Sequence, residues 1–220
     1  MKILSHRGYW KEEKEKNTID AVRKAFDHGF GIESDIRDLD GKLVISHNPA
    51  DSACPMAEDV FELMRDNGDK YCFAINIKAD GLKGMLGELL SKYQIDNYFT
   101  FDMSVPQMLE YREKGIRYYT RQSEYEKEPV LYHDAAGVWA DAFEDDEWIT
   151  EELIRRHLEN GKTVCIVSPD LHNRDNLEFW NRLVSYELNW EKVMLCTDRP
   201  DAAKEYFREF IDSAGGKSTL

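Results

Sequence analysis

The sequence predicts a (β/α)8 barrel, and three observations support this fold class. Short apolar runs of strand length recur along the chain, an amphipathic stretch of helical length follows most of them, and no Pro-, Gly- or Ser-rich linker interrupts the series. A chain of 220 residues with 42% hydrophobic residues can also bury a full core. We therefore expect one barrel domain over residues 1–212 and a flexible tail over residues 213–220.

Eight apolar runs supply the expected strands. They are four to seven residues long, the usual length of buried strands. They lie at residues 2–5, 30–36, 71–77, 98–101, 117–120, 137–142, 163–167 and 193–197. An additional run at residues 43–48 follows a tight Asp40-Gly41 turn, so we expect it to continue the second strand or to pair with it.

Helix start and stop signals flank several of the intervening stretches. Asn17 or Thr18 can cap the first helix and Gly29 follows its end, while Ser104 and Gly115 bracket a later one. Further helices are expected within residues 145–161, 173–187 and 199–216. The stretch between residues 121 and 137 is weaker, and we expect a short helix there at most.

A doubly wound open sheet is the alternative architecture. That fold usually carries a Gly-x-Gly-x-x-Gly loop after its first strand, and here the first strand is followed by Arg7-Gly8-Tyr9-Trp10. The barrel is therefore favoured.

Charge and cysteine content narrow the classes of partner. A net charge of −14 argues against a nucleic-acid partner and against electrostatic docking on anionic lipid. The chain shows no apolar run long enough for a membrane span and no long apolar signal segment near its start. Its four cysteines form no Cys-x-x-Cys pair, which favours buried thiols in a reducing compartment. We expect a cytoplasmic protein with a small-molecule substrate and no stable membrane insertion.

Polar side chains gather at the carboxyl ends of the expected strands, where barrel enzymes place their chemistry. Glu33 and Asp35 share one face of the second strand, because residues i and i+2 of a strand point the same way. Two adjacent carboxylates inside a barrel need a cation or water. The remaining candidates from the strand ends are His6, Arg7, His47, Asn76, Lys78, Asp102 and Asp198.

Several of these residues have a structural alternative. Asp198, followed by Arg199 and Pro200, could cap the last helix, and Lys78 or Arg37 could form a structural ion pair with the two carboxylates. The aromatic candidates could line a substrate pocket or pack in the core; they are Tyr9, Trp10 and Trp139. The other histidines are expected to be surface or hydrogen-bonded residues; they are His28, His133, His157 and His172.

The ordered set resembles the glycerophosphodiester phosphodiesterase family of barrels related to phospholipase C. The family pattern runs H-R-G, E-N-T, E-x-D, H-D, E-x-K and T-D-x-P. The matching positions are His6-Arg7-Gly8, Asn17-Thr18, Glu33 with Asp35, His47, Lys78 and Thr197 to Pro200. The resemblance implies a (β/α)8 barrel and a phosphoric diester hydrolase. The short segment after His47 implies that no large inserted subdomain is present.

Three positions depart from the family pattern. Lys16 replaces the Glu of E-N-T, Asn48 replaces the Asp of H-D, and Asn76 replaces the Glu of E-x-K, which is a metal ligand in the family. The loss of a carboxylate at position 76 should weaken metal binding while making the site less repulsive to a phosphate. Which effect dominates stays open.

The resemblance implies a role for each matching residue. Glu33, Asp35 and the amide oxygen of Asn76 would bind Mg²⁺ or Ca²⁺, and Arg7 and Lys78 would bind the phosphate oxygens. His6 and His47 would serve as general acid and base, in an order the sequence leaves open. Two alternatives remain: a barrel that binds phosphate esters without catalysis, and a lyase-type activity that releases a cyclic phosphate.

Overall fold

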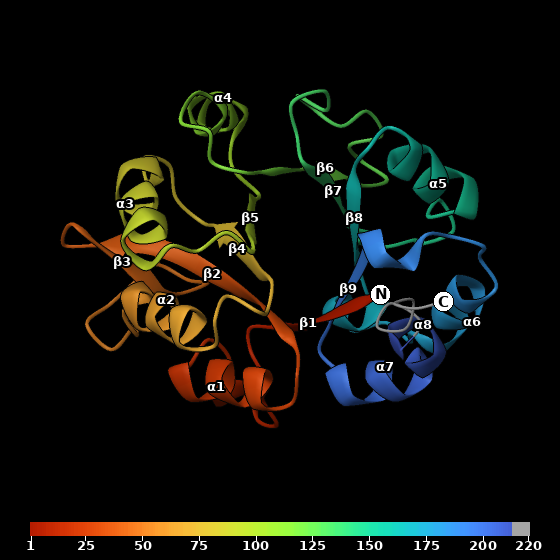
Figure 1. Cartoon of the computed structure of the whole chain (residues 1–220), viewed down its shortest axis with the longest axis horizontal. Coiled ribbons are helices and arrows are strands. Elements are labelled where there is room, and N and C mark those ends of the chain that lie inside the picture. The colour runs from red at the N-terminus through yellow and green to blue at the C-terminus, as the bar shows by residue number, and fades with distance from the viewer. Residues whose placement is uncertain (213–220) are drawn as a thin grey trace, which may run out of the picture. The chain divides into compact units, whose positions relative to one another are not determined.

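The computed structural model describes residues 1–212, in which strands and helices alternate along most of the chain (Figure 1). The strands are β1 Lys2–His6, β2 Gly31–Leu39, β3 Lys42–Ile45, β4 Phe73–Ile77, β5 Tyr98–Phe101, β6 Tyr119–Gln122, β7 Gly137–Ala140, β8 Thr163–Val167 and β9 Val193–Thr197. The α-helices are α1 Ile19–Asp27, α2 Ala57–Asp66, α3 Lys83–Tyr93, α4 Val105–Glu113, α5 Glu151–Glu159, α6 Leu177–Val184, α7 Pro200–Tyr206 and α8 Arg208–Asp212. Short 3-10 turns lie at η1 Glu13–Glu15, η2 Pro169–His172 and η3 Trp190–Lys192.

Each of the eight apolar runs forms a strand, but several boundaries differ from the prediction. β6 begins at Tyr119 rather than at residue 117, and α5 begins at Glu151 because Thr150 accepts a hydrogen bond from the Leu153 backbone N–H as the N-cap. The helix expected over residues 199–216 divides into α7 and α8 within its described part. The expected tail at residues 213–220 lies outside the described residues.

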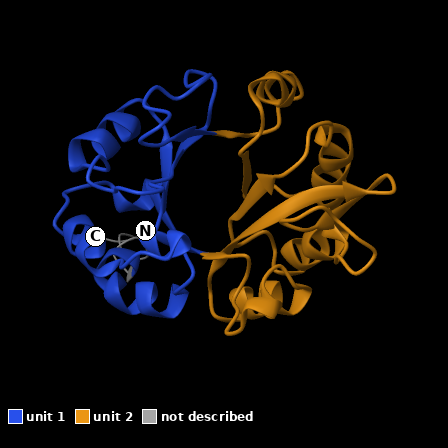
Figure 2. Ribbon diagram, turned by 180° about the vertical axis from the view of Figure 1, so that it is seen from behind, with its two compact units in different colours: residues 1–4, 120–220 blue, residues 5–119 orange. Residues whose placement is uncertain are grey.

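The chain divides into two compact units, coloured separately in Figure 2. Unit 2 comprises residues 5–119, and unit 1 comprises residues 1–4 together with the chain from residue 120 onward. β1 contributes residues to both units. The expectation of a single domain over residues 1–212 stays a prediction.

Unit 2 is built on parallel strands in the order β5-β4-β2, with β3 added to β2 in antiparallel register. In the parallel pair, Glu33 lies opposite Ala74 and Asp35 lies opposite Asn76. β3 pairs Ile45 with Ile36, so the expected hairpin at Asp40-Gly41 is confirmed. This register brings polar residues of two neighbouring strands to the same level of the sheet.

The core of unit 2 comes from the apolar faces of its helices and strands. α1 begins after Thr18, whose hydroxyl accepts the Ala21 N–H at 3.2 Å, and buries Val22 and Phe26. The ring of Phe61 on α2 meets Phe73 on β4 edge to face at 5.8 Å. Burial of such side chains stabilises each helix by about 1.5–3 kcal/mol per large residue, more than helix propensity alone supplies.

Unit 1 is built on parallel strands in the order β9-β8-β7-β6. The stretch between residues 121 and 137 contains turns and bends and no helix, so the short helix allowed for it is absent. Side-chain hydrogen bonds to the backbone organise this stretch instead. Gln122 Nε2 donates to the Lys127 carbonyl at 2.8 Å, and the Ser123 hydroxyl accepts the Glu126 N–H at 3.0 Å.

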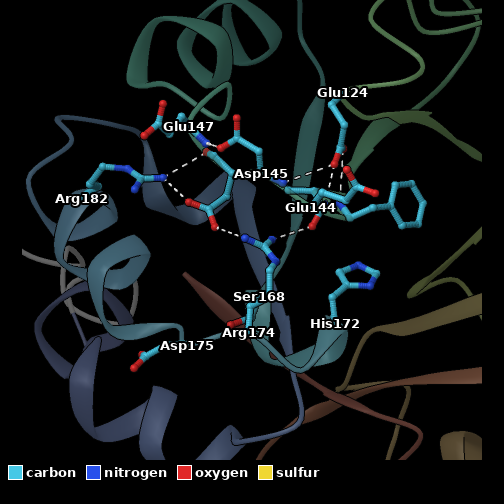
Figure 3. A network of polar contacts seen from close by, with 12 residues as sticks. Glu124, Glu144, Asp145, Glu147, Ser168, His172, Arg174, Asp175 and Arg182 are labelled. Atoms are coloured by element: carbon cyan, nitrogen blue, oxygen red, sulfur yellow. Dashed lines mark hydrogen bonds and ion pairs between the residues drawn. The ribbon is translucent and has the colours of Figure 1, made fainter.

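The loop after β7 is held by charged side chains (Figure 3). The carboxylate of Glu124 accepts the backbone N–H groups of Phe143 at 3.2 Å and Glu144 at 2.6 Å. Asp146, from the same loop, forms ion pairs with Arg174 and Arg182. These contacts fix the loop without regular secondary structure. No helix among residues 1–212 is long and apolar enough to cross a membrane.

Candidate active site

His6 is the last residue of β1, and a sharp turn follows it at Arg7 and Gly8. Arg7 has φ 57° and Gly8 has φ 84°, and the Gly8 N–H donates to the Ser5 carbonyl at 3.2 Å. A Cβ at Gly8 would lie 2.8 Å from Ala21 at the start of α1. Glycine is therefore required here for both its conformation and its lack of a side chain.

Two buried carboxylates on β2 contact His6 and Arg7. Glu33 and Asp35 are 1% and 0% exposed. Glu33 Oε2 lies 3.7 Å from His6 Nε2 and accepts the Arg7 backbone N–H at 3.2 Å. Asp35 Oδ2 lies 3.1 Å from Arg7 Nε, and its Oδ1 lies 3.5 Å from Lys78 Nζ. The structure thus brings together five predicted site residues.

Burial makes this carboxylate pair electrostatically costly. Desolvation, with repulsion from Asp35 as a second cause, raises the pKa of Glu33 to about 7. The charges of His6, Arg7 and Lys78 act in the opposite direction. The net effect remains a raised pKa, because desolvation of the buried Glu33 carboxyl, together with repulsion from Asp35, outweighs the attraction of these basic neighbours.

The oxygen atoms of this site fit a hard divalent cation. Asp35 Oδ1 and Asn76 Oδ1 are both buried without a hydrogen-bond donor, and their residues lie opposite each other on β2 and β4. Mg²⁺ and Ca²⁺ prefer carboxylate and amide oxygens. No group of three or more His, Cys, Asp or Glu side chains that could hold a metal ion occurs within residues 1–212. Of the three residues whose oxygens could bind the cation, Glu33 and Asp35 are carboxylates and Asn76 is an amide, which falls outside those residue types.

Lys78 and Asp102 extend the charged group from the ends of β4 and β5. Lys78 Nζ lies 3.7 Å from Asp102 Oδ2 and is thus placed between two carboxylates. Asp102 has φ 67°, a left-handed conformation that Asp adopts more readily than most residues. Lys78 follows β4 directly, as its place in the sequence predicts.

His47 follows β3, and its contacts differ from those of His6. The Ser46 N–H donates to the Asp35 carbonyl at 3.0 Å, which ties this part of the chain to β2. The exposed imidazole of His47 has its Nδ1 3.1 Å from Asn48 Oδ1, so an amide orients the ring where the family pattern has a carboxylate. Arg37 bonds the His47 carbonyl through Nε at 3.2 Å and Nη2 at 3.1 Å.

The aromatic residues after the turn have different environments. Tyr9 is buried and stacks on His28 with ring centroids 4.3 Å apart, which supports the packing alternative for Tyr9. Trp10 Nε1 donates to the His6 carbonyl at 2.9 Å, and Lys16 Nζ lies 4.2 Å from the Trp10 ring centroid. Trp10 therefore supports the backbone at His6.

Trp139 and Asp198 belong to unit 1. Trp139 Nε1 donates to Asp141 Oδ2 at 3.3 Å. The backbone N–H of Asp198 donates to Asp170 at 2.7 Å. The sequence reasoning had named neither partner.

In unit 2, the sequence did not predict that Asn17 contacts Asp35. Asn17 Nδ2 donates to Asp35 Oδ2 at 2.8 Å, whereas the sequence analysis names Asn17 as a possible helix cap and as part of the Asn17-Thr18 match, without a contact to Asp35. A signal was present, because Thr18 beside it is itself a good cap and leaves the Asn17 amide available.

Comparison with known proteins identifies the fold. No family model matches the chain, and no curated protein matches it. Among solved structures, a glycerophosphoryl diester phosphodiesterase of Parabacteroides distasonis ATCC 8503 matches with a TM-score of 0.72 and 14% identity, covering 100% of this chain and 91% of that chain. A candidate glycerophosphodiester phosphodiesterase of Galdieria sulphuraria matches with a TM-score of 0.70 and 18% identity, covering 98% of each chain.

A third match is an Oleispira antarctica phosphodiesterase in complex with its product sn-glycerol-3-phosphate. Its TM-score is 0.65 at 14% identity, and the match covers 94% of this chain and 97% of that chain. These likenesses span nearly the whole of each chain, so the predicted barrel without a large inserted subdomain is confirmed. They agree with the resemblance that the motifs indicated, and they show that this chain has the (β/α)8 barrel fold of known glycerophosphodiester phosphodiesterases.

Proposed function

We propose that the protein is a metal-dependent phosphodiester hydrolase of the glycerophosphodiester phosphodiesterase type. The observation that carries the proposal is the contact group of His6, Arg7, Glu33, Asp35 and Lys78 at the strand ends of unit 2. This group combines hard oxygen ligands, fixed cations and an imidazole. The fold shared with glycerophosphodiester phosphodiesterases supports the same reaction class.

A phosphodiester is an anion and repels nucleophiles, so its negative charge must be neutralised. Glu33, Asp35 and Asn76 would hold Mg²⁺ or Ca²⁺, which supplies Lewis-acid stabilisation of the phosphate oxygens when bound. Arg7 and Lys78 would bind the non-bridging oxygens, Arg7 as a planar donor and Lys78 as a point charge. Both side chains form ion pairs with Asp35, and this common contact supports their assignment to the same site.

The two histidines would transfer the protons. One imidazole removes the proton of an attacking hydroxyl, and the other donates a proton to the departing alcohol oxygen as the P–O bond breaks. When the hydroxyl belongs to the substrate, the product is a cyclic phosphate, which water can then open. His6 lies beside the Glu33 carboxylate and His47 beside the neutral Asn48 amide, so the two rings have different electrostatic surroundings.

Phosphorus NMR on a panel of phosphodiesters, glycerophosphodiesters included, tests the proposal. His6→Ala and His47→Ala should each lower kcat by about 10²–10⁴-fold, and EDTA should abolish turnover until Mg²⁺ or Ca²⁺ is restored. His28→Ala is the matched control, because His28 is an exposed histidine of unit 2 that bonds the Lys24 carbonyl. Wild-type rates in both site variants would refute the assignment. The phosphorus shift of the product also distinguishes hydrolysis from release of a cyclic phosphate.

A barrel that binds phosphate esters without turnover is the second candidate. It is favoured by Asn48 and Asn76, which place amides where the family pattern has carboxylates. Saturable binding of a phosphate ester with no phosphorus product under any cation would support this second function and exclude the first.

A further inference from the structure

Asn17 has an unusual backbone conformation between η1 and α1. Its φ of 59° is left-handed, and its backbone N–H donates to the Arg7 carbonyl at 2.9 Å. The neighbouring Thr18 caps α1, with its hydroxyl accepting the Ala21 N–H at 3.2 Å. The Asn17 amide is therefore not used to begin the helix.

The side-chain amide of Asn17 is held through both its oxygen and its nitrogen. The Ser34 hydroxyl, which is fully buried, donates to Asn17 Oδ1 at 2.7 Å. Asn17 Nδ2 donates to Asp35 Oδ2 at 2.8 Å. Because the hydroxyl donor requires an acceptor, the Ser34 contact directs the NH₂ group of Asn17 toward Asp35.

This contact distinguishes the two oxygens of Asp35. Oδ2 accepts from Asn17 and lies 3.1 Å from Arg7 Nε. Oδ1 is buried without a hydrogen-bond donor, 3.5 Å from Lys78 Nζ, on the strand position opposite Asn76. The carboxylate thus has one occupied oxygen and one oxygen available to a ligand.

We propose that Asn17 is a positioning residue that holds Asp35 through Oδ2 and so presents Oδ1 to a divalent cation. This inference rests on the proposed function, which supplies the cation. Groups that orient a metal ligand from behind commonly change metal affinity about 10–100-fold when removed. A neutral amide suits the task, because it fixes the carboxylate while leaving its charge unneutralised.

The test uses Asn17→Gly, since glycine adopts φ 59° readily and the variant therefore removes the amide without straining the backbone. Titration calorimetry with MgCl₂ and with CaCl₂ measures cation affinity directly. Asn17→Gly should weaken binding about 10–100-fold, and Ser34→Ala should weaken it in the same direction by freeing the amide. Thr18→Ala is the matched control, because it disturbs the start of α1 without touching Asp35, and its cation affinity should equal that of the wild type.

A second measurement separates positioning from a structural effect. In Asn17→Gly the cation concentration that gives half-maximal phosphodiester turnover should rise, and excess cation should restore most of kcat. Equal cation affinity in Asn17→Gly and wild type overturns the inference while leaving the proposed function standing. A similar loss in Thr18→Ala and Asn17→Gly also overturns it, because the effect would then come from α1. A wild-type protein that binds neither cation overturns both the inference and the metal-dependent function.

Discussion

Replacing Gly8 with alanine tests whether the turn after β1 requires the close approach to α1. Gly8 has φ 84°, and an added Cβ would lie 2.8 Å from the Cβ and carbonyl carbon of Ala21 and 3.0 Å from the Val22 nitrogen. The left-handed conformation costs about 1–2 kcal/mol for alanine. The overlap with backbone atoms of α1 adds about 1–3 kcal/mol, the usual range for overpacking.

Gly81 provides a matched control for the conformational part of this cost. Its φ is 86°, and a Cβ there would meet no atom within 4 Å. Both substitutions restrict the unfolded chain equally, so this contribution cancels in the comparison. Gly8→Ala should therefore lower the free energy of unfolding by about 1–3 kcal/mol more than Gly81→Ala does.

Urea unfolding, followed by circular dichroism and tryptophan fluorescence, measures this difference. Equal destabilisation by the two substitutions would show that only the positive φ matters, and the argument from close packing against Ala21 would be wrong. Phosphodiester turnover in the folded Gly8→Ala protein should also fall, because the same turn carries His6 and Arg7.

Three further predictions concern polar groups that are fully or partly buried. Burial lowers the pKa of His157 from 6.5 to about 4. The neutral ring therefore contributes up to about 3 kcal/mol of stability, which is complete above pH 6.5 and is lost as the pH falls through 4. Urea unfolding at several pH values should show this loss, and the His157→Gln variant should lack it. Asn76→Asp should lower the melting temperature in EDTA, because it adds a buried carboxylate opposite Asp35, and should raise cation affinity; unchanged values of both would contradict the proposed site. Asp146→Ala removes the shared partner of Arg174 and Arg182 and should cost about 1–3 kcal/mol in urea unfolding, whereas a neutral effect would show that solvent replaces the carboxylate.

The fold could be predicted from sequence because strand and helix periodicity recurs through the chain. Periodicity reports which side chains are buried, and the buried strands β8 and β9 have the same bounds as their apolar runs. It does not report which polar side chain bonds the backbone. The stretch between residues 121 and 137 illustrates this limit: its weak pattern allowed a short helix at most, and the bonds of Gln122 and Ser123 organise it without one.

The candidate site was partly predictable for a similar reason. Consecutive strand ends of a parallel sheet meet at one edge, which is why Asp35, Asn76 and Lys78 are neighbours as expected. Individual partners require side-chain geometry. Lys78 does pair with Asp35, but Arg37, the other cation considered for the carboxylates, bonds the His47 carbonyl instead. Thr18 as the better helix cap left the Asn17 amide available, but its contacts with Ser34 and Asp35 follow only from the folded chain.

The hairpin formed by β2 and β3 has a consequence for changes in chain length. Its base is fixed by the pairing of Ile36 with Ile45 and by the bond from the Ser46 N–H to the Asp35 carbonyl, while its tip at Asp40-Gly41 has open space around Gly41. Residues inserted at the tip lengthen the hairpin without moving the paired residues Ile36 and Ile45 at its base. The position of His47 is thus insulated from insertions there, and the tip is a suitable place for a peptide tag or a fused module that leaves the site intact.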